Sequence, residues 1–498
     1  MSDKLNKFKE MIGEVFDLNR AASVLSWDQQ VNMPPGGAEA RGQQLATLGK
    51  IAQEKFTSDE MGSLLEELKK EYTDPETDEG AIVRVAARDY EKAKRVPPEF
   101  VAEQAMVSTK AVEAWVEAKG KSDFSIFRPH LEKNLELIKK YVSFFPPADH
   151  PYDVLLDDYE PGLPTAEVRE IFGNLRPKQV ALIKAIGEAK QVKSDFLKKS
   201  FNEKKVWDFG ETVIRKFGYD FRRGRQDKAP HPFETTFSVD DVRITNRFEK
   251  NSPLATLFSA MHECGHALYE LGGNPAYERT PLASGTSLAV HESQSRMWEN
   301  LVGRSLPFWE HFYPELKKAF PSQLNGVNVK AFYKAINKVE PSLIRVNADE
   351  ATYNLHIMLR LEIEIGMVEG SIAVKDLPEI WNARMHDYLG VTPPSDSQGV
   401  LQDIHWSYGS IGYFSTYALG NIISAQLWER INKEIRNLEE QIRKGQFAEL
   451  REWLRKNIHQ YGHKYDPREL VRKVTGNDID SAAYVRYLTE KYGEIYGL

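Results

Sequence analysis

Apolar residues recur along most of this chain at the three- and four-residue spacing of an amphipathic helix. The first such stripe, in residues 3–18, consists of Leu5, Phe8, Met11, Ile12, Val15 and Phe16. The same periodicity returns in SLLEELKKEY, FRPHLEKNLELIKKYVSFF, EVREIFGNLRPKQVALIKAIGEAK, YNLHIMLRLEIEIGMV, AQLWERINKEIRNLEEQIRKG and AAYVRYLTEKYGEIYG. Because residues three and four apart share one face of a helix, this pattern predicts a mostly all-α protein.

The best strand candidate is FETTFSVDDVRITNRF, residues 233–248, where Thr, Val, Ile and Phe alternate with polar residues around an Asp-Asp turn. We expect a small antiparallel β-sheet there. Turn-forming Pro, Gly and Asp gather between the helical stretches, but these segments are short, which indicates loops rather than domain linkers. The basic residues 222–227, RRGRQD, are interpreted as a solvated loop rather than an anion site.

Composition excludes several classes of protein. The 498 residues could form two or three domains, but a formal net charge of -7 gives no indication of a nucleic-acid partner. No apolar run approaches a membrane span, and the charged start lacks the apolar core of a signal peptide. The single cysteine, Cys264, excludes an internal disulfide. A cytoplasmic protein without a membrane partner is the expectation.

The strongest chemical signal is the stretch HECGH, residues 262–266. Ser252 and Pro253 are typical of the start of a helix, and the glycines at 272 and 273 predict its end. On such a helix His262 and His266 lie on one face and can bind one metal ion, while Glu263 lies beside them and can hold a water molecule. Two core histidines beside a surface glutamate are the alternative interpretation.

A catalytic zinc site needs a third protein ligand and an open position for water. The next predicted helix, HESQSRMWENLVG, offers His291, Glu292 and Glu299. Neighbours on a helix diverge by about 100°, so only one of the first two is expected to face the metal, and spacing does not choose between them. Cys264 is two residues from His262, which turns its thiol away from the metal face. We interpret it as a small buried side chain.

Five motifs in this chain, in order, make it resemble the metallocarboxypeptidases typified by carboxypeptidase Taq. They are DVRIT at Asp241–Thr245, HECGH at His262–His266, HESQ at His291–Gln294, IRVNAD at Ile344–Asp349 and GVLQDIHW at Gly399–Trp406. Flanking stretches such as YDVLLDDYEPG and GYFSTYALGN extend the likeness over most of the chain.

The resemblance implies a nearly all-helical, neurolysin-like fold with two lobes flanking a deep active-site groove. The whole chain, 1–498, would be one metallocarboxypeptidase domain, and homodimers are usual in the family. The resemblance also implies that Glu292 completes the site with His262 and His266. The expected cofactor is one Zn²⁺ per chain, for which Co²⁺ is a possible substitute.

The expected chemistry is peptide hydrolysis with Glu263 as general base. His405 and Tyr417 are candidates for stabilising the oxyanion, although Tyr408 and Tyr413 are alternatives to Tyr417 and any of these phenols can be a core residue. Asp403 is a possible acceptor that orients a histidine, or a loop cap.

Two arginines are the candidates for binding peptide substrates. A carboxypeptidase must recognise a free carboxylate, and the resemblance assigns this to Arg345, for which a salt bridge to Asp349 or Glu350 is the alternative. The resemblance also implies that Arg243, held by Asp241, lies along the substrate groove and limits peptide length, although a structural role is equally open.

The favoured hypothesis is therefore a zinc carboxypeptidase that releases single C-terminal residues from short peptides with broad specificity. An oligoendopeptidase with the same zinc chemistry is one alternative. A non-catalytic helical binding protein with a structural metal is another, but such a metal would normally have four protein ligands.

Overall fold

A computed structural model describes residues 2–250 and 252–498. The first half of the chain forms the helices α1 Asp3–Val31, α2 Ala38–Phe56, α3 Asp59–Glu71, α4 Asp78–Arg95, α5 Pro98–Lys121, α6 Phe124–Val142, α7 Pro151–Leu156, α8 Thr165–Glu188 and α9 Glu203–Phe217. The strands are β1 Gln226–Lys228, β2 Glu234–Ser238 and β3 Asp241–Asn246. The mostly helical class predicted from the periodicity is confirmed.

The second half of the chain carries the remaining long helices. They are α10 Pro253–Leu271, α11 Leu288–Arg296, α12 Leu306–Ala319, α13 Val329–Ile336, α14 Glu350–Glu369, α15 Leu377–Leu389, α16 Ser415–Glu434, α17 Leu438–Arg443, α18 Ala448–Asn457, α19 Pro467–Thr475 and α20 Ala482–Tyr496. A π-helical turn, η4 Met297–Val302, continues α11. Within the described residues, none of the helices combines the length and the apolar character that a membrane crossing requires.

The sheet is mixed rather than purely antiparallel. β2 and β3 form the predicted antiparallel hairpin, with Thr235 opposite Arg243, and the order of the strands is β1-β3-β2. β1 pairs with β3 in parallel and comes from the end of the segment that the sequence predicted as a loop. Val242 and Ile244 of β3 are fully buried. The sheet packs through β3 against α10, and so lies directly beside the predicted metal helix.

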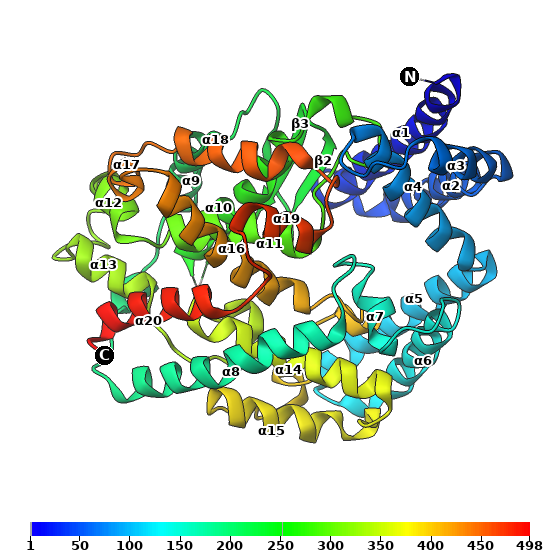
Figure 1. Cartoon of the computed structure of the whole chain (residues 1–498). Coiled ribbons are helices and arrows are strands. Elements are labelled where there is room, and N and C mark those ends of the chain that lie inside the picture. The colour runs from blue at the N-terminus through cyan, green and yellow to red at the C-terminus, as the bar shows by residue number, and fades with distance from the viewer. Residues whose placement is uncertain (1, 251) are drawn as a thin grey trace.

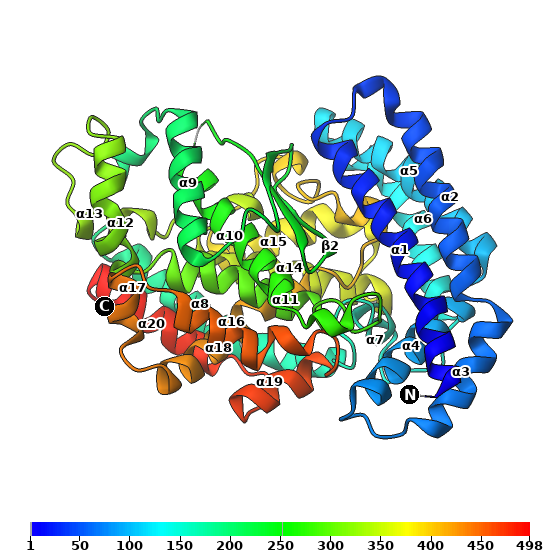
Figure 2. The same cartoon turned by 90° about the horizontal axis from the view of Figure 1, so that it is seen from above.

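Two hydrophobic clusters stabilise the chain. One belongs mainly to α1, α2, α3 and α4, joined by Tyr277 and Leu282 from the loop after α10. These four helices lie together at one side of the molecule in both views (Figure 1, Figure 2). The second and larger cluster contains the rest of the helices and the sheet. The expectation of one domain with two lobes flanking a cleft stays a prediction.

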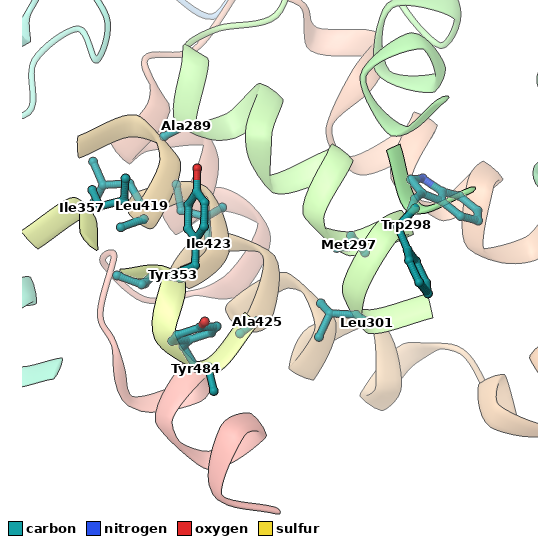
Figure 3. Packing of buried hydrophobic residues seen from close by; sticks show 14 of the residues in the cluster. Ala289, Met297, Trp298, Leu301, Tyr353, Ile357, Leu419, Ile423, Ala425 and Tyr484 are labelled. Carbon is teal, nitrogen blue, oxygen red and sulfur yellow. The ribbon is translucent and has the colours of Figure 1, made fainter. Parts of the chain in front are cut away.

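The centre of the larger cluster is α16, which packs closely against α11 and α14. Figure 3 shows buried side chains of these helices and of η4 and α20 gathered in one region, among them Ala289, Tyr353, Leu419 and Tyr484. Burial of aliphatic and aromatic side chains on this scale is the main stabilising contribution to a fold. The helix that carries Glu292, α11, is therefore held by α16, and it also packs against α10.

Candidate metal centre and its surroundings

The predicted metal helix is α10, and it begins and ends where the sequence indicated. Ser252 occupies the cap position, although its side chain makes no capping hydrogen bond within the described residues, and Gly272 follows the last turn. His262 and His266 lie one turn apart, with ring centroids 4.9 Å from each other. Both imidazoles keep a partly exposed edge, whereas most of α10 is buried. The helix thus presents two histidines at one accessible place.

The second component comes from α11, which crosses close to α10. A Cβ atom at Gly265 would lie 2.6 Å from the Cα atom of Ser295, so only glycine allows this approach. From the other side, a Cβ atom at Gly420 of α16 would lie 2.6 Å from Cβ of Glu292. Two glycines therefore determine how closely three helices meet at Glu292.

The structure brings Glu292 to the two histidines. Its Oε2 atom lies 3.5 Å from Nε2 of His262 and 3.4 Å from Nε2 of His266. The three donor atoms all lie within 4.8 Å of one another. Burial opposes ionisation of Glu292, but the charge of Arg296 and the two imidazoles hold its pKa well below the usual range. Two imidazole nitrogens and one carboxylate oxygen match the donor set of a catalytic zinc site, so these residues fit a divalent metal.

The other candidates for the third ligand lie behind the histidines. Oε2 of Glu299 is 3.0 Å from Nδ1 of His262. Nδ1 of His291 is 2.5 Å from Nδ1 of His266, and its Nε2 atom is 2.9 Å from Oε1 of Glu270. Each imidazole is thus bonded through Nδ1 and turns Nε2 towards Glu292. Contacts of this kind fix the tautomer and orientation of a metal-binding histidine.

Glu263 is buried beside the two histidines. Burial raises the pKa of its carboxyl group to about 7, against a smaller opposing effect of His262. A carboxyl group that titrates near neutral pH is well matched to accept and return a proton. Cys264 is fully buried in the main core, in agreement with its interpretation as a packing residue.

Arg345 is buried beside the aromatic rings of Tyr353 and Tyr417. Nε and Nη2 donate to Oδ1 of Asp403 at 3.1 and 2.9 Å, and Nη1 donates to the hydroxyl of Tyr353 at 2.9 Å. The alternative partners Asp349 and Glu350 are engaged elsewhere: Asp349 caps α14, and the carboxylate of Glu350 binds Lys491. Arg345 is therefore held by Asp403 rather than by its sequence neighbours.

Asp403 has a different role from the one that the sequence suggested. Its two carboxylate oxygens bind Arg345 and Arg360, and no hydrogen bond joins it to a histidine within the described residues. It is the counter-ion of two arginines, a relationship that depends on α14 and is invisible in the local sequence.

The oxyanion candidates lie together. The ring of His405 is 5.3 Å from that of Tyr413 and 6.4 Å from that of Tyr417, and the guanidinium of Arg345 lies 5.1 Å from the Tyr417 ring. Burial lowers the pKa of His405 to about 4, so its imidazole is neutral at pH 7. Tyr408 is 52% exposed and does not take part in these ring contacts. Of the three phenols considered from the sequence, Tyr413 and Tyr417 therefore remain as candidates.

Arg243 lies on β3, where Asp241 holds it through two hydrogen bonds of 2.8 Å. Its guanidinium also lies 4.4 Å from the ring of Trp27 in α1 and 4.8 Å from that of Phe237. The structure thus gives Arg243 a packing role between the sheet and α1, while part of its side chain stays exposed.

Three contributors to the site are absent from the sequence interpretation. Arg296 donates to Glu292 at 2.7 Å and to Glu299 at 3.1 Å, Glu270 supports His291, and Arg360 binds Asp403. Arg296 follows Glu292 by four residues, a spacing that places both on one helix face and could have indicated the contact. No comparable local signal exists for Arg360.

A helix that carries two histidines, a carboxylate from a crossing helix as the third candidate ligand, and a buried glutamate beside the histidines are the features of a metallopeptidase of the HExxH class. The chain belongs to the carboxypeptidase Taq (M32) metallopeptidase family, which it matches over residues 7–492. Membership of this family implies a divalent metal.

Individual relatives agree with this assignment. The chain is 42% identical to thermostable carboxypeptidase 1 of Pyrococcus furiosus and 35% identical to carboxypeptidase 1 of Bacillus subtilis, covering 96% and 98% of each pair of chains. The crystal structure of the M32 carboxypeptidase from Deinococcus radiodurans superposes with a TM-score of 0.96 at 40% identity, over 100% of both chains. The protein is therefore a metallocarboxypeptidase, and neither alternative class is favoured.

Proposed function

We propose that this carboxypeptidase uses one Zn²⁺ per chain, bound by His262, His266 and Glu292, and that Co²⁺ can replace it. The convergence of two Nε2 atoms and one Oε2 atom supports this ligand set. A zinc ion in such a set lowers the pKa of a bound water and polarises a peptide carbonyl. Loss of one equivalent of zinc on chelation, with activity restored by Zn²⁺ or Co²⁺, is the expected result.

Glu263 takes a proton from the attacking water and returns it to the leaving amine. Its burial beside His262 supports this role, since a carboxyl group with a pKa near 7 exchanges protons readily at neutral pH. His405 and Tyr417 stabilise the oxyanion, with Tyr413 as the competing phenol. The contacts among these three rings support their common participation.

Arg345 binds the C-terminal carboxylate of the peptide, and this contact decides which end is cut. Of its five N–H groups, three donate to Asp403 and Tyr353, which leaves one on each terminal nitrogen without a partner among the described residues. A guanidinium can bind the two oxygens of a carboxylate through two of its N–H groups. This is the observation that carries the proposal that single residues are released from the C-termini of short peptides with broad specificity.

The test compares N-blocked dipeptides that end in a free carboxylate with the same compounds ending in an amide. Hydrolysis of the acids with release of one amino acid, and loss of hydrolysis on amidation, is the expected result. If longer amidated peptides are cut internally at the same rate as free acids, the protein acts as an oligoendopeptidase and the role of Arg345 is wrong.

Three further expectations belong to this proposal. The chain forms a homodimer and works in the cytoplasm, and Arg243 limits the length of the bound peptide. Its fixed position through Asp241 supports the last point. Replacement of Arg243 by alanine should increase the hydrolysis of longer peptides relative to dipeptides, and unchanged length dependence would leave Arg243 with its packing role alone.

A further inference from the structure

A second arginine, Arg360, shares the carboxylate of Asp403 with Arg345. Arg360 comes from the middle of α14, and its side chain is fully buried. Nε and Nη2 of Arg360 donate to Oδ2 of Asp403 at 2.7 and 2.5 Å, whereas Arg345 donates to the other oxygen, Oδ1. One carboxylate therefore joins two guanidinium groups, and each group is bound by a different oxygen.

The remaining contacts of Arg360 also lie inside the protein. Nη1 donates to the backbone carbonyl of His356 at 2.6 Å, and Nη2 donates to Oε1 of Gln402 at 2.8 Å. The guanidinium lies 4.5 Å from the ring of Trp381. Oε1 of Gln402 also accepts from the backbone N–H of Arg345 at 2.9 Å. Because it is fully buried, Arg360 holds its neighbours and does not itself touch a substrate.

The group of Arg345, Arg360 and Asp403 carries one excess positive charge. Burial opposes ionisation of Asp403, but the charges of Arg360 and Arg345 hold its pKa well below the usual range. Glu364, on the same helix as Arg360, forms no hydrogen bond to either arginine in the described part of the chain, and burial raises its pKa to about 7. A buried charge without a partner is costly, so this group favours an arriving anion.

We propose that Arg360 is a positioning residue that keeps Arg345 available for the C-terminal carboxylate of the peptide. The inference rests on the proposed function, in which Arg345 binds that carboxylate. Arg360 compensates the negative charge of Asp403, so that Asp403 fixes the orientation of Arg345 without cancelling its charge. The consequence is a preference for a free carboxylate over a neutral amide at the end of the substrate.

Removal of the guanidinium tests this role. In Arg360→Met, Arg345 is the one arginine of this pair that still binds Asp403, so the carboxylate neutralises its charge. KM for an N-blocked dipeptide should then rise roughly tenfold or more, with a smaller change in kcat, since hydrogen bonds to charged groups have effects of this size. The preference for acid over amide should fall by a similar factor. KM and preference equal to those of the wild type would overturn the proposal.

A second substitution separates charge compensation from simple structural damage. Adding Asp403→Asn to Arg360→Met removes the carboxylate that would neutralise Arg345, so KM should recover at least part of the loss. A purely structural role predicts a double variant that is as impaired as Arg360→Met or worse, and that result would overturn the proposal. Arg176→Met is the matched control, because Arg176 pairs with Glu362 of the same helix, and its KM should stay at the wild-type value.

Two measurements keep the test decisive. Thermal unfolding and bound metal show whether each variant is folded and loaded. If Arg360→Met does not fold, Arg360→Lys keeps the charge that compensates Asp403, so its KM should be clearly lower than that of the neutral variant Arg360→Gln. Equal KM values in these two variants would contradict charge compensation. If the wild type itself hydrolyses amides as fast as acids, the proposed function fails together with the inference. If the wild type clearly prefers acids and the Arg360 variant keeps the same KM and the same preference, the inference alone is overturned.

Discussion

Nδ1 of His291 lies 2.5 Å from Nδ1 of His266, and the opposite nitrogen of the His291 ring contacts the carboxylate of Glu270. His291 therefore supports His266, one of the proposed metal ligands, through its Nδ1 atom. We predict that His291→Ala retains metal but binds it about 10- to 100-fold more weakly, as is typical for loss of such a supporting contact. Competition with a chelator of known affinity measures this change, and an unchanged affinity would show that the contact does not orient His266.

Glu292 should behave differently from His291. Its carboxylate faces both Nε2 atoms, so Glu292→Ala should lose stoichiometric metal at concentrations where the wild type is saturated. Metal analysis after gel filtration gives the answer. His386→Ala, a change on the exposed surface of α15, is the control and should bind one equivalent. Full metal content in Glu292→Ala would contradict the ligand assignment.

Replacement of Glu263 separates catalysis from metal binding. Glu263→Gln keeps the shape of the side chain but cannot accept a proton, and general-base catalysis contributes roughly 10²- to 10⁴-fold to the rate. We expect kcat to fall by at least this factor while the bound metal remains stoichiometric. Activity close to that of the wild type would show that another group accepts the proton.

The two candidate phenols, Tyr417 and Tyr413, should have separable effects on kcat. Tyr417 lies beside Arg345. The pKa of the Tyr413 hydroxyl is raised by burial and also by the charge of Glu292. Removing one donor to an oxyanion costs roughly 10²- to 10³-fold in kcat. We predict this loss for Tyr417→Phe, and a loss of that size in Tyr413→Phe alone would transfer the role to Tyr413. Tyr408→Phe, at an exposed position, is the control and should leave kcat unchanged.

A single methyl group should disturb the metal centre from a distance in sequence. The Cβ atom added in Gly420→Ala would lie 2.6 Å from both Cβ and Cγ of Glu292, so α16 or the Glu292 side chain must move. We expect weaker metal binding and a lower thermal midpoint. Gly173→Ala is the matched control on α8, where a Cβ atom meets nothing within 4 Å, and it should stabilise by about 0.5–1 kcal/mol. Equal metal affinity in both variants would contradict the close contact.

The features that the sequence predicted well depend on local signals. The limits of α10 follow from Ser252, Pro253 and Gly272, because helix start and stop residues act within one turn. The hairpin of β2 and β3 follows from alternation around a turn. The position of His262 and His266 on one face of α10 follows from the period of the helix.

The features that the residues alone missed or left open depend on contacts between distant segments. β1 is short and polar and becomes a strand only because β3 offers a parallel partner, which no local pattern encodes. The choice of Glu292 over His291 depends on how α11 crosses α10, and so on the contact of Gly265 with Ser295. The role of Asp403 depends on Arg360, 43 residues away in sequence. The resemblance to a family predicted Glu292 as the third ligand, whereas the residues alone left the choice between Glu292 and His291 open.

The start of α11 makes stability depend on pH. Oε1 of Glu160 accepts a hydrogen bond from the backbone N–H of Ala289 at 2.5 Å, while Oε2 is buried without a partner in the described structure. Burial raises the pKa of Glu160 from 4.5 to about 8. Between these two pH values the folded state keeps a proton on Glu160 that the unfolded state has lost. The contribution of Glu160 to the free energy of unfolding is therefore fully present below pH 4.5 and is lost as pH rises to about 8.

Glu160→Gln removes this titration and retains an oxygen that can accept from Ala289. The stability of the variant relative to the wild type should therefore increase with pH between 5 and 8, by about 1.4 kcal/mol per pH unit at most. Thermal midpoints of both proteins, measured at a series of pH values with the same scan rate and buffer ionic strength, give this difference directly. A difference that is constant with pH would mean that Glu160 is ionised in the folded protein throughout, and that the N-terminus of α11 tolerates a buried negative charge.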